Sequence, residues 1–391
     1  MRLDADRWRK KRGVQRILDA LESAQGMTRY VGGAVRDDLL GLPVSDIDFA
    51  TRLRPEQVVE KLEAARIKAV PTGIEHGTIT AVADGQPAEV TTLRADVSTD
   101  GRRATVAFTD DWMADASRRD FTINALYADP QSGEVHDYFG GLEDLQAGRV
   151  RFIGDPLVRI AEDHLRILRF FRFHARYGAG EPDAAALEAC TARANDLMAL
   201  SRERVADELL KLLALADPGA TVALMIAKGI LRPVVPEIGS AVRLKQLIAA
   251  ETKAGIEPDP LRRLAALLPQ DPDRADKIAA RLKLSNRARK RAAVAAETDL
   301  SDSPHALAYW LGTESAQDRL LLANRPSEAA QLRGWPLPRL PIRGGQLIKR
   351  GVPEGPLVAK TLQEIERQWV AAGFPGGEPF ERIVRGALTA D

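Results

Sequence analysis

The chain has 391 residues, of which 45% are hydrophobic and 28% charged, with a formal net charge of +1 at pH 7. This composition supports cores in two or more domains, and no apolar run approaches the ~18 residues that a membrane span requires. The single cysteine, Cys190, excludes an intramolecular disulfide framework and is typical of a reducing compartment. Because the basic amino-terminal stretch has no apolar core, we expect no secretory signal and a cytoplasmic location.

The first functional pattern follows a strand expected at residues 28–31. An amphipathic helix over 14–25 precedes that strand, and a helix over 35–40 follows the pair Gly32 and Gly33. Glycines at a strand–helix junction let the backbone approach a phosphate, whose charge is favourable at a helix N-terminus. Arg36, one turn into the helix, can add a charge-assisted fork to the same phosphates. The junction therefore predicts a nucleotide-phosphate site.

Paired carboxylates come next along the chain. Asp46 and Asp48 flank Ile47 at a strand expected over 47–50, and residues two apart in a strand point to the same face. Hard oxygen ligands suit Mg²⁺, and two such ions can activate a hydroxyl and stabilise a leaving pyrophosphate. We therefore predict two Mg²⁺ ions on Asp46 and Asp48. Glu89, on a strand expected over 88–92, is a third candidate, as metal ligand or general base; a solvent-facing strand residue is the ordinary alternative.

A helix over 55–65 and a strand over 78–83 complete a small mixed α/β region. The polar stretch between Asp96 and Trp112 has no clear periodicity and predicts a mobile, functional loop. The run 118–120 is expected to open a helix. Its arginines, Arg118 and Arg119, could bind triphosphate oxygens, while Asp120 could cap the helix or orient an arginine. The alternative is a surface ion pair.

From Pro156 onward apolar residues recur at helical spacing and strand signals vanish. Asp163 and Arg166 are three apart, which places them on one face of an expected helix. A carboxylate accepts from an amino group and a guanidinium donates to a ring nitrogen, so such a pair could admit cytosine and adenine and refuse uracil and guanine. The ordinary alternative is a helix-surface ion pair.

Basic residues recur along this helical part. Four arginines lie on nearly one face, a costly arrangement without an anion: Arg159, Arg166, Arg169 and Arg172. Ser201 is expected to cap a helix that supports them. The runs 286–291 and 351–355 could contact RNA phosphates. Prolines between 335 and 341 indicate a connector.

The run VGGAVRDDLLGLPVSDIDFAT (31–51) resembles the signature of polymerase-beta-type nucleotidyltransferases. The similar branch is class II, which contains CCA-adding tRNA nucleotidyltransferases and bacterial poly(A) polymerases. Three later motifs follow in the family's order: RRDFTINAL (118–126), RIAEDHLRILRFFRF (159–173) and SRERVADELLKLL (201–213).

The resemblance implies an α+β protein with a mixed α/β nucleotidyltransferase head followed by helical parts. The expected boundaries are a head at 1–150, a neck at 151–220, a body at 221–334 and a tail at 335–391. It also implies that Arg119 binds triphosphate and that Arg169 and Arg172 contact nucleotide. The implied substrates are ATP, CTP and a tRNA 3′ end, with no membrane and no obligatory protein partner.

The leading interpretation is addition and repair of the 3′-terminal CCA of tRNA. A bacterial poly(A) polymerase shares nearly every motif, and the A-adding half of a split CC/A system is a third possibility. A non-enzymatic RNA-binding protein with a degenerate head is the fourth. Against it stands the complete set of motif residues, Asp46, Asp48, Arg119, Asp163 and Arg166.

Overall fold

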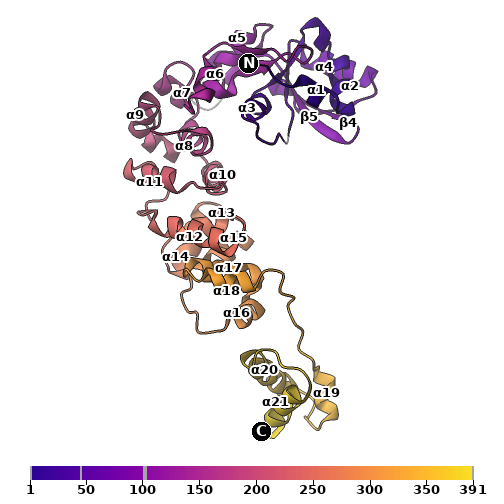
Figure 1. Ribbon diagram of the computed structural model, residues 1–391, viewed down its shortest axis with the longest axis vertical. Coiled ribbons are helices and arrows are strands. Elements are labelled where there is room, and N and C mark those ends of the chain that lie inside the picture. Colours follow the sequence, from indigo (N-terminus) through magenta and orange to yellow (C-terminus); the bar gives the residue numbers. More distant parts are fainter. Residues whose placement is uncertain (1, 45, 100–103, 390–391) are drawn as a thin grey trace. The chain divides into compact units, whose positions relative to one another are not determined.

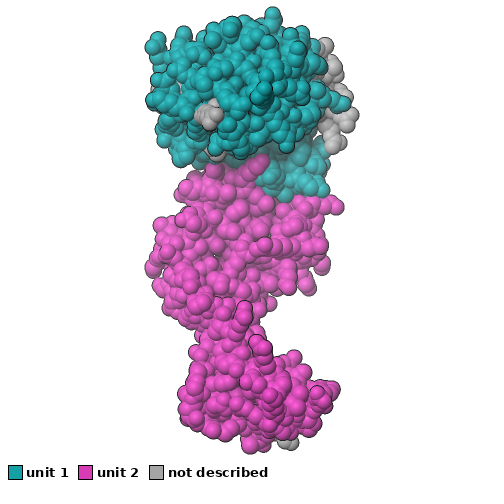
Figure 2. Space-filling model, turned by 90° about the vertical axis from the view of Figure 1, so that its right-hand side faces the viewer, with its two compact units in different colours: residues 1–208, 227–234 teal, residues 209–226, 235–391 magenta. Residues whose placement is uncertain are grey.

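The computed structural model describes residues 2–44, 46–99 and 104–389. The chain forms two compact units, one of residues 1–208 with 227–234 and one of residues 209–226 with 235–391 (Figure 2). All strands of the described residues belong to the first unit, and from Pro156 onward the described elements are helices. The expected α+β class, with a small sheet-containing head and a helical remainder, is confirmed.

The main sheet of the first unit has seven strands in the order β3–β4–β5–β2–β1–β8–β9. Figure 1 labels two of them, β4 and β5. Its strands are β1 (Thr28–Val31), β2 (Phe49–Thr51), β3 (Lys68–Gly73), β4 (Thr78–Ala83), β5 (Gln86–Thr92), β8 (Leu126–Ala128) and β9 (Val135–Asp137). Neighbours are antiparallel except β2 and β5, which are parallel with Phe49 opposite Val90. Asp48 comes directly before Phe49 and Glu89 directly before Val90, so the parallel register brings these two carboxylates side by side.

Helices cover both faces of this sheet. The helices of the first unit are α1 (Ala5–Arg9), α2 (Arg12–Ala20), α3 (Gly33–Leu39), α4 (Pro55–Ala64), α5 (Trp112–Ser117), α6 (Gly141–Gln146), α7 (Pro156–Glu162), α8 (Arg166–Tyr177), α9 (Ala184–Ala192) and α10 (Arg202–Leu213), which continues into the second unit. Tyr30 packs edge-on against Trp8 of α1, with ring centroids 4.8 Å apart. Val31 packs in one cluster with Trp112 of α5. Since successive strand residues point to opposite faces, α1 and α5 cover opposite faces.

The carboxylate pair lies beside a strand rather than within one. Asp46, Ile47 and Asp48 precede β2, which begins at Phe49. The Val31 amide donates to the Asp48 carbonyl at 3.1 Å, so strand pairing extends to Asp48. Ile47 is buried while Asp46 is exposed, which preserves the alternation that the sequence predicted.

The prediction of a loop between Asp96 and Trp112 is wrong for the segments on either side of residues 100–103. They form a separate hairpin of β6 (Arg94–Thr99) and β7 (Ala104–Phe108), with Arg94 opposite Phe108. Residues 100–103 of the predicted loop lie outside the described residues. The strands were not predicted because they contain polar and small residues, and the backbone pairing that forms them leaves no alternation in the sequence.

The prediction that residues 118–120 begin a helix is also wrong. The side chain of Asp111 accepts from the Met113 amide at 2.8 Å and caps α5, which ends at Ser117. Residues 118–120 therefore close a helix, and a short 3₁₀ turn, Thr122–Asn124, leads into β8. Asp163 likewise lies outside a helix, with φ −151° and ψ 106°, between the end of α7 and the start of α8.

The second unit is helical in its described residues. Its further helices are α11 (Gly219–Ala227), which begins in it and ends in the first unit, α12 (Val242–Ala254), α13 (Pro260–Leu267), α14 (Pro272–Arg281), α15 (Asn286–Ala296), α16 (Pro304–Leu311), α17 (Thr313–Leu322), α18 (Pro326–Gln331), α19 (Gly344–Lys349), α20 (Pro356–Ala371) and α21 (Gly377–Thr389). Residues 332–343, which include the predicted proline-rich connector, contain neither helix nor strand. Across the described ranges, every helix is too short or too polar to cross a membrane.

Candidate nucleotide-binding and active site

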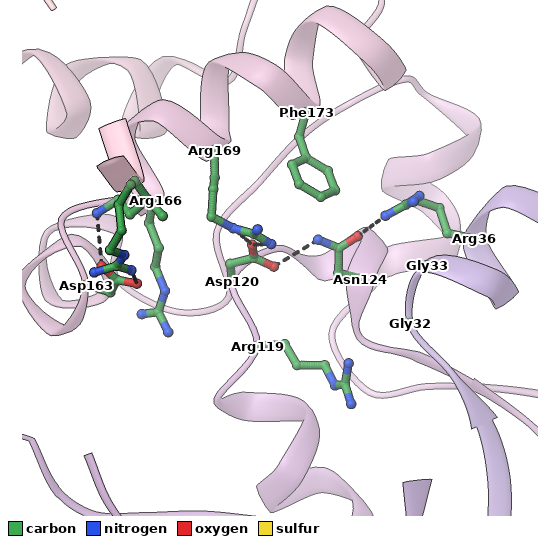
Figure 3. A pocket seen from close by; sticks show the side chains of 12 residues that line it. Gly32, Gly33, Arg36, Arg119, Asp120, Asn124, Asp163, Arg166, Arg169 and Phe173 are labelled. Carbon is green, nitrogen blue, oxygen red and sulfur yellow. Dashed lines mark hydrogen bonds and ion pairs between the residues drawn. The ribbon is translucent and has the colours of Figure 1, made fainter. Parts of the chain in front are cut away.

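A cavity of about 570 Å³, called the basic cavity below, lies in the first unit. It lies among β1, α3, the turn after α5 and the start of α8 (Figure 3). Its walls are polar and mainly basic, and they contain most of the predicted nucleotide-binding residues. The lining residues are Gly32, Gly33, Arg36, Arg119, Asp120, Asn124, Asp163, Leu165, Arg166, Arg169, Phe173 and Arg204.

Gly32 follows β1 and precedes α3 with φ +68°, a conformation that L side chains rarely adopt. A Cβ added there would lie 3.2 Å from Nη1 of Arg119. Glycine is therefore required for the backbone turn and for the close approach of an arginine. Both consequences agree with the phosphate site predicted at this junction.

Arg36 is fixed by several contacts of its guanidinium. Its Nε donates to Oδ1 of Asp37 at 2.8 Å, and Nη1 donates to Oδ1 of Asn124. The guanidinium carbon also lies 4.1 Å from the ring centroid of Tyr177 on α8. Only 6% of Arg36 is exposed, so a ligand in the cavity would meet a side chain whose position is already set.

Arg119 lines the basic cavity and also a neighbouring, smaller cavity of about 260 Å³. Its Nε donates to the Tyr127 hydroxyl at 3.2 Å, and Nη2 lies 3.3 Å from Oδ2 of Asp115. The Tyr127 hydroxyl itself donates to Asp115 at 2.6 Å. Arg118 lines only the smaller cavity.

The predicted carboxylates lie together where the chain enters β2, beside the middle of β5. Asp48 and Glu89 line the smaller cavity with Arg119, and they also line a cavity of about 360 Å³ with Asp46. Burial, the largest cause, and the charges of Glu89 and Asp46 together raise the pKa of Asp48 to about 6, against the opposing effect of Arg119. Carboxylates that repel one another in a partly buried place are a donor set that suits a hard cation. No group of three or more His, Cys, Asp or Glu side chains among the described residues is already arranged as a metal site.

Asp163 and Arg166 both line the basic cavity, but each contacts other residues rather than its predicted partner. Oδ2 of Asp163 accepts from Nη2 of Arg204 at 2.7 Å, and Oδ1 accepts from the Leu165 amide at 3.1 Å. Arg166 is held by Glu162 and donates to the Arg159 carbonyl at 2.7 Å. Its orientation therefore comes from the end of α7 rather than from Asp163.

The sequence predicted that Arg159, Arg166, Arg169 and Arg172 need an external anion, but in the structure carboxylates of the chain itself contact them. Arg159 and Arg166 both contact Glu162, which compensates their mutual repulsion. Arg169 contacts Asp120, with Nε–Oδ2 at 2.7 Å. These carboxylates come from within the chain, and one of them, Asp120, is 49 residues from the arginine that it contacts.

Arg172 is the one predicted nucleotide-binding residue that lines none of the cavities described above. Its Nε donates to Oε2 of Glu208 on α10 at 2.6 Å. The prediction that Asp120 orients an arginine is supported by its contact with Arg169. Burial alone would raise the pKa of Asp120, but Arg169, Asn124 and the Phe121 amide together hold that pKa below its usual range.

Two polar lining residues were not predicted. Asn124 is a polar residue inside an otherwise apolar run, and that contrast is a signal the sequence does contain. Arg204 lies on α10, whose first turn receives the predicted cap from Ser201, with the Arg204 amide 3.4 Å from Ser201 Oγ. Its contact with Asp163 spans 41 residues and has no local signal.

Comparisons with known proteins agree with this geometry. Residues 28–151 match the family described as "Poly A polymerase head domain", and residues 181–241 match "Probable RNA and SrmB- binding site of polymerase A". The chain is 35% identical over 376 residues to the CCA tRNA nucleotidyltransferase 1, mitochondrial, of Danio rerio, covering 91% of this chain and 86% of that protein. It is 31% identical over 383 residues to the CCA-adding enzyme of Levilactobacillus brevis, covering 93% and 94%.

Solved structures give the same result. The Bacillus stearothermophilus CCA-adding enzyme in complex with CTP matches with a TM-score of 0.74 and 26% identity, over 97% of this chain and 99% of that one. The Thermotoga maritima CCA-adding enzyme complexed with tRNA shares the fold, with a TM-score of 0.71 at 18% identity over 97% and 96%. By sequence similarity over nearly its whole length and by fold, the chain belongs to the family of CCA-adding tRNA nucleotidyltransferases.

Proposed function

We propose that the protein adds and repairs the 3′-terminal CCA of tRNA, using CTP and ATP without a nucleic-acid template. In each step the 3′-hydroxyl oxygen of the RNA attacks the α-phosphorus of the nucleotide. A new phosphodiester bond forms, the bond between the α-phosphorus and the bridging oxygen breaks, and pyrophosphate leaves. The hydroxyl proton passes to a base, for which Glu89 is the candidate.

The observation that carries this proposal is the position of Arg119. It lines both the basic cavity and the smaller cavity that contains Asp48 and Glu89. A nucleotide in the basic cavity would therefore have its phosphates next to the carboxylates. Electrostatic stabilisation of the charge that develops on pyrophosphate is the largest contribution that such a site can make.

The donor set fits Mg²⁺, with Asp46 and Asp48 as ligands and Glu89 as a further oxygen donor. When bound, two Mg²⁺ ions would activate the attacking hydroxyl and neutralise charge on the phosphates. The chain's own contribution is to hold the triphosphate with Gly32, Gly33, Arg36, Arg118 and Arg119, and to orient it toward these carboxylates.

Base selection is assigned to Asp163 and Arg166. Each carboxylate oxygen can accept more than one hydrogen bond, so Asp163 could receive the exocyclic amine of cytosine or adenine while Arg204 holds it in place. Arg166 would donate to the ring nitrogen beside that amine. Uracil and guanine present an oxygen and a donor at these positions, and the mismatch would leave buried polar groups unpaired.

For the other parts of the chain we propose a head at 1–150, a neck at 151–220 and an RNA-binding body and tail at 221–334 and 335–391. Arg169 would contact nucleotide directly, and Arg172 would contribute through its place on α8. A compartment that keeps Cys190 reduced, such as the cytoplasm, is the proposed location.

The test is a transfer assay with purified protein, Mg²⁺ and tRNA that lacks one, two or three terminal nucleotides. CTP, ATP, UTP and GTP are supplied singly and together, and products are resolved to single nucleotides. We expect the tRNA 3′ end to be extended first with CTP and then with ATP, and extension to stop at CCA. A lengthening A tail without use of CTP would assign the protein to the poly(A) branch, and addition of A alone would indicate half of a split system.

A further inference from the structure

An arginine of the second unit is buried at the point where α10 ends. Arg263 of α13 is only 1% exposed. Its Nη1 donates to the carbonyl of Leu213 at 2.8 Å and to that of Leu215, and its Nη2 donates to the Ala216 carbonyl at 3.1 Å. The last carbonyls of a helix have no amide partner within the helix, and a positive charge is favourable beside them. Arg263 therefore binds the end of α10 to α13.

Carboxylates compensate the buried charge of Arg263. Its Nε donates to Oε2 of Glu251 on α12 at 2.9 Å, and Glu251 is 2% exposed. Oε1 of Glu251 accepts from Nη1 of Arg262 at 2.7 Å, and Nε of Arg262 donates to Oδ1 of Asp318 on α17 at 2.8 Å. Removal of one member would leave a buried charge without its partner, which is strongly destabilising. The end of α10 is therefore held firmly within the second unit.

The first turns of the same helix contact residues predicted to bind nucleotide. Nη2 of Arg204 donates to Oδ2 of Asp163 at 2.7 Å. Glu208 accepts from Nε of Arg172 at 2.6 Å. These contacts belong to the first unit, whereas α10 continues without interruption into the second unit and ends at Leu213. A rigid element that reaches two sites can carry energetic coupling between them.

The two ends of α10 differ in how firmly they are held. Arg263 is buried, but the side chains of Arg204 and Asp163 are 43% and 35% exposed. An ion pair with this exposure contributes little by itself, because water competes for both charges. A ligand that fixes α10 would therefore favour the arrangement in which Arg204 holds Asp163.

We propose that Arg263 is a positioning residue that anchors α10, so that RNA bound by the second unit favours the arrangement of Asp163 that binds nucleotide. The inference rests on the proposed function, because it takes tRNA and a nucleoside triphosphate as the two ligands. Coupling between two binding sites is reciprocal. Bound tRNA should therefore raise the affinity for CTP by the same factor by which bound CTP raises the affinity for tRNA, a factor of about ten.

The first test titrates the protein with a CTP analogue that carries a methylene group in place of the α,β-bridging oxygen, so that no transfer occurs. Titrations are made with and without tRNA that ends at its base-paired acceptor stem and has no 3′ nucleotides to touch the analogue. We expect this tRNA to lower the Kd of the analogue about tenfold in the wild type. Arg263→Met and Arg263→Lys should abolish most of this factor. Lysine keeps a positive charge beside Glu251 but lacks the guanidinium fork that reaches several carbonyls, so it keeps the test decisive if Arg263→Met fails to fold.

Arg319→Met is the matched control. Arg319 lies on α17, is 8% exposed and donates to the Asp299 carbonyl, so the control also removes a buried arginine that holds the backbone. We expect it to lower thermal stability, as the Arg263 variants do, and to keep the coupling of the wild type. If Arg263→Lys keeps that coupling, or if Arg319→Met loses as much of it, Arg263 has only a structural role and the inference is wrong.

The second test leaves both ends of α10 unchanged. Lys211 is exposed on α10, between Glu208 and Leu213. Lys211→Gly and Lys211→Ala remove the same side chain, but only glycine loosens the helix. Lys211→Gly should therefore have a smaller coupling factor than Lys211→Ala. Equal factors for the two variants would contradict transmission through α10.

Transfer assays separate this inference from the proposed function. A wild-type protein that extends tRNA to CCA, but binds the analogue equally well with and without the shortened tRNA, overturns the inference and leaves the proposed function in place. A protein that shows the coupling, loses it in the Arg263 variants and does not extend tRNA supports the inference and contradicts the proposed function.

Discussion

At the scale of single residues, positive charge around the basic cavity is balanced by carboxylates of the chain itself. Glu162 forms ion pairs with Arg159 and Arg166, and Asp120 forms one with Arg169. An arginine held in this way keeps its charge and loses its freedom to rotate. Its hydrogen-bonding fork is then available in one orientation, which is a requirement for selecting among ligands rather than merely attracting anions.

Replacing Asp46 tests the assignment of the catalytic carboxylates. Asp46→Ala should reduce nucleotide transfer by at least about a thousandfold, because charge stabilisation at the reacting phosphate is lost. Binding of tRNA should remain nearly intact, which a filter or anisotropy assay would check. Asp19→Ala is the matched control, since Asp19 is an exposed carboxylate of α2 that accepts from Gln15 at 2.7 Å. Activity of Asp46→Ala close to that of the control would exclude Asp46 as a metal ligand.

Asp163→Ala tests base selection. The variant should relax or destroy the preference for CTP and ATP over UTP and GTP, because the acceptor for the exocyclic amine is removed. Single-nucleotide incorporation with each of the four nucleotides measures this directly. Arg204→Ala should change the preference less, since it removes only the group that holds Asp163 at 2.7 Å. Selectivity of Asp163→Ala equal to that of the wild type would remove Asp163 from this role.

At the scale of elements, local pattern predicted the parts that have local causes. β1 and β4 have the predicted bounds, because turns containing glycine delimit them and their residues pack against helices. β6 and β7 were predicted as a loop, since only the pairing between them makes them strands. The pair Asp163 and Arg166 was placed on one helix, although the chain leaves the helix at Asp163. Each of these predictions was wrong because contacts with residues outside the short segment considered determine the conformation.

The packing of α6 against the turn that contains Asn124 is a tight contact between elements. A Cβ added at Gly141, the first residue of α6, would lie 2.3 Å from the Thr122 carbonyl oxygen. Gly141→Ala should therefore lower the free energy of unfolding by about 1–3 kcal/mol, the usual cost of overpacking. Thermal unfolding, checked with denaturant, measures the change.

The control for this prediction is Gly386→Ala. Gly386 lies within α21, and a Cβ there would meet no atom within 4 Å. Alanine in an open helical position should raise stability by about 0.5–1 kcal/mol. Equal effects of the two substitutions would show that the backbone around Thr122 moves without cost.

At the scale of the whole molecule, the near balance of 56 basic and 55 acidic residues hides how the charges are distributed. The basic run 286–291 was predicted to contact RNA phosphates, but its members differ in structure. Arg291 is buried and contacts Asp318 at 2.6 Å, within the core of the second unit. Arg287 and Lys290 are exposed and three residues apart on α15. Only the exposed members remain suitable for RNA, a division that composition alone could not show.

That division makes a prediction about salt. Phosphate contacts release counterions, so the logarithm of tRNA affinity should fall linearly with the logarithm of salt concentration. Replacing Arg287 and Lys290 together with alanine should reduce the magnitude of that slope by roughly 1–2, since each lost phosphate contact contributes about 1. The KM for CTP should not change, because neither residue belongs to the cavities of the first unit. Arg7→Ala removes an exposed arginine of α1 that contacts Asp38 at 3.1 Å, and it should leave the slope unchanged. If the double variant and Arg7→Ala give the same slope as the wild type, this face of α15 makes no phosphate contact, and the RNA-binding charge of the protein lies elsewhere.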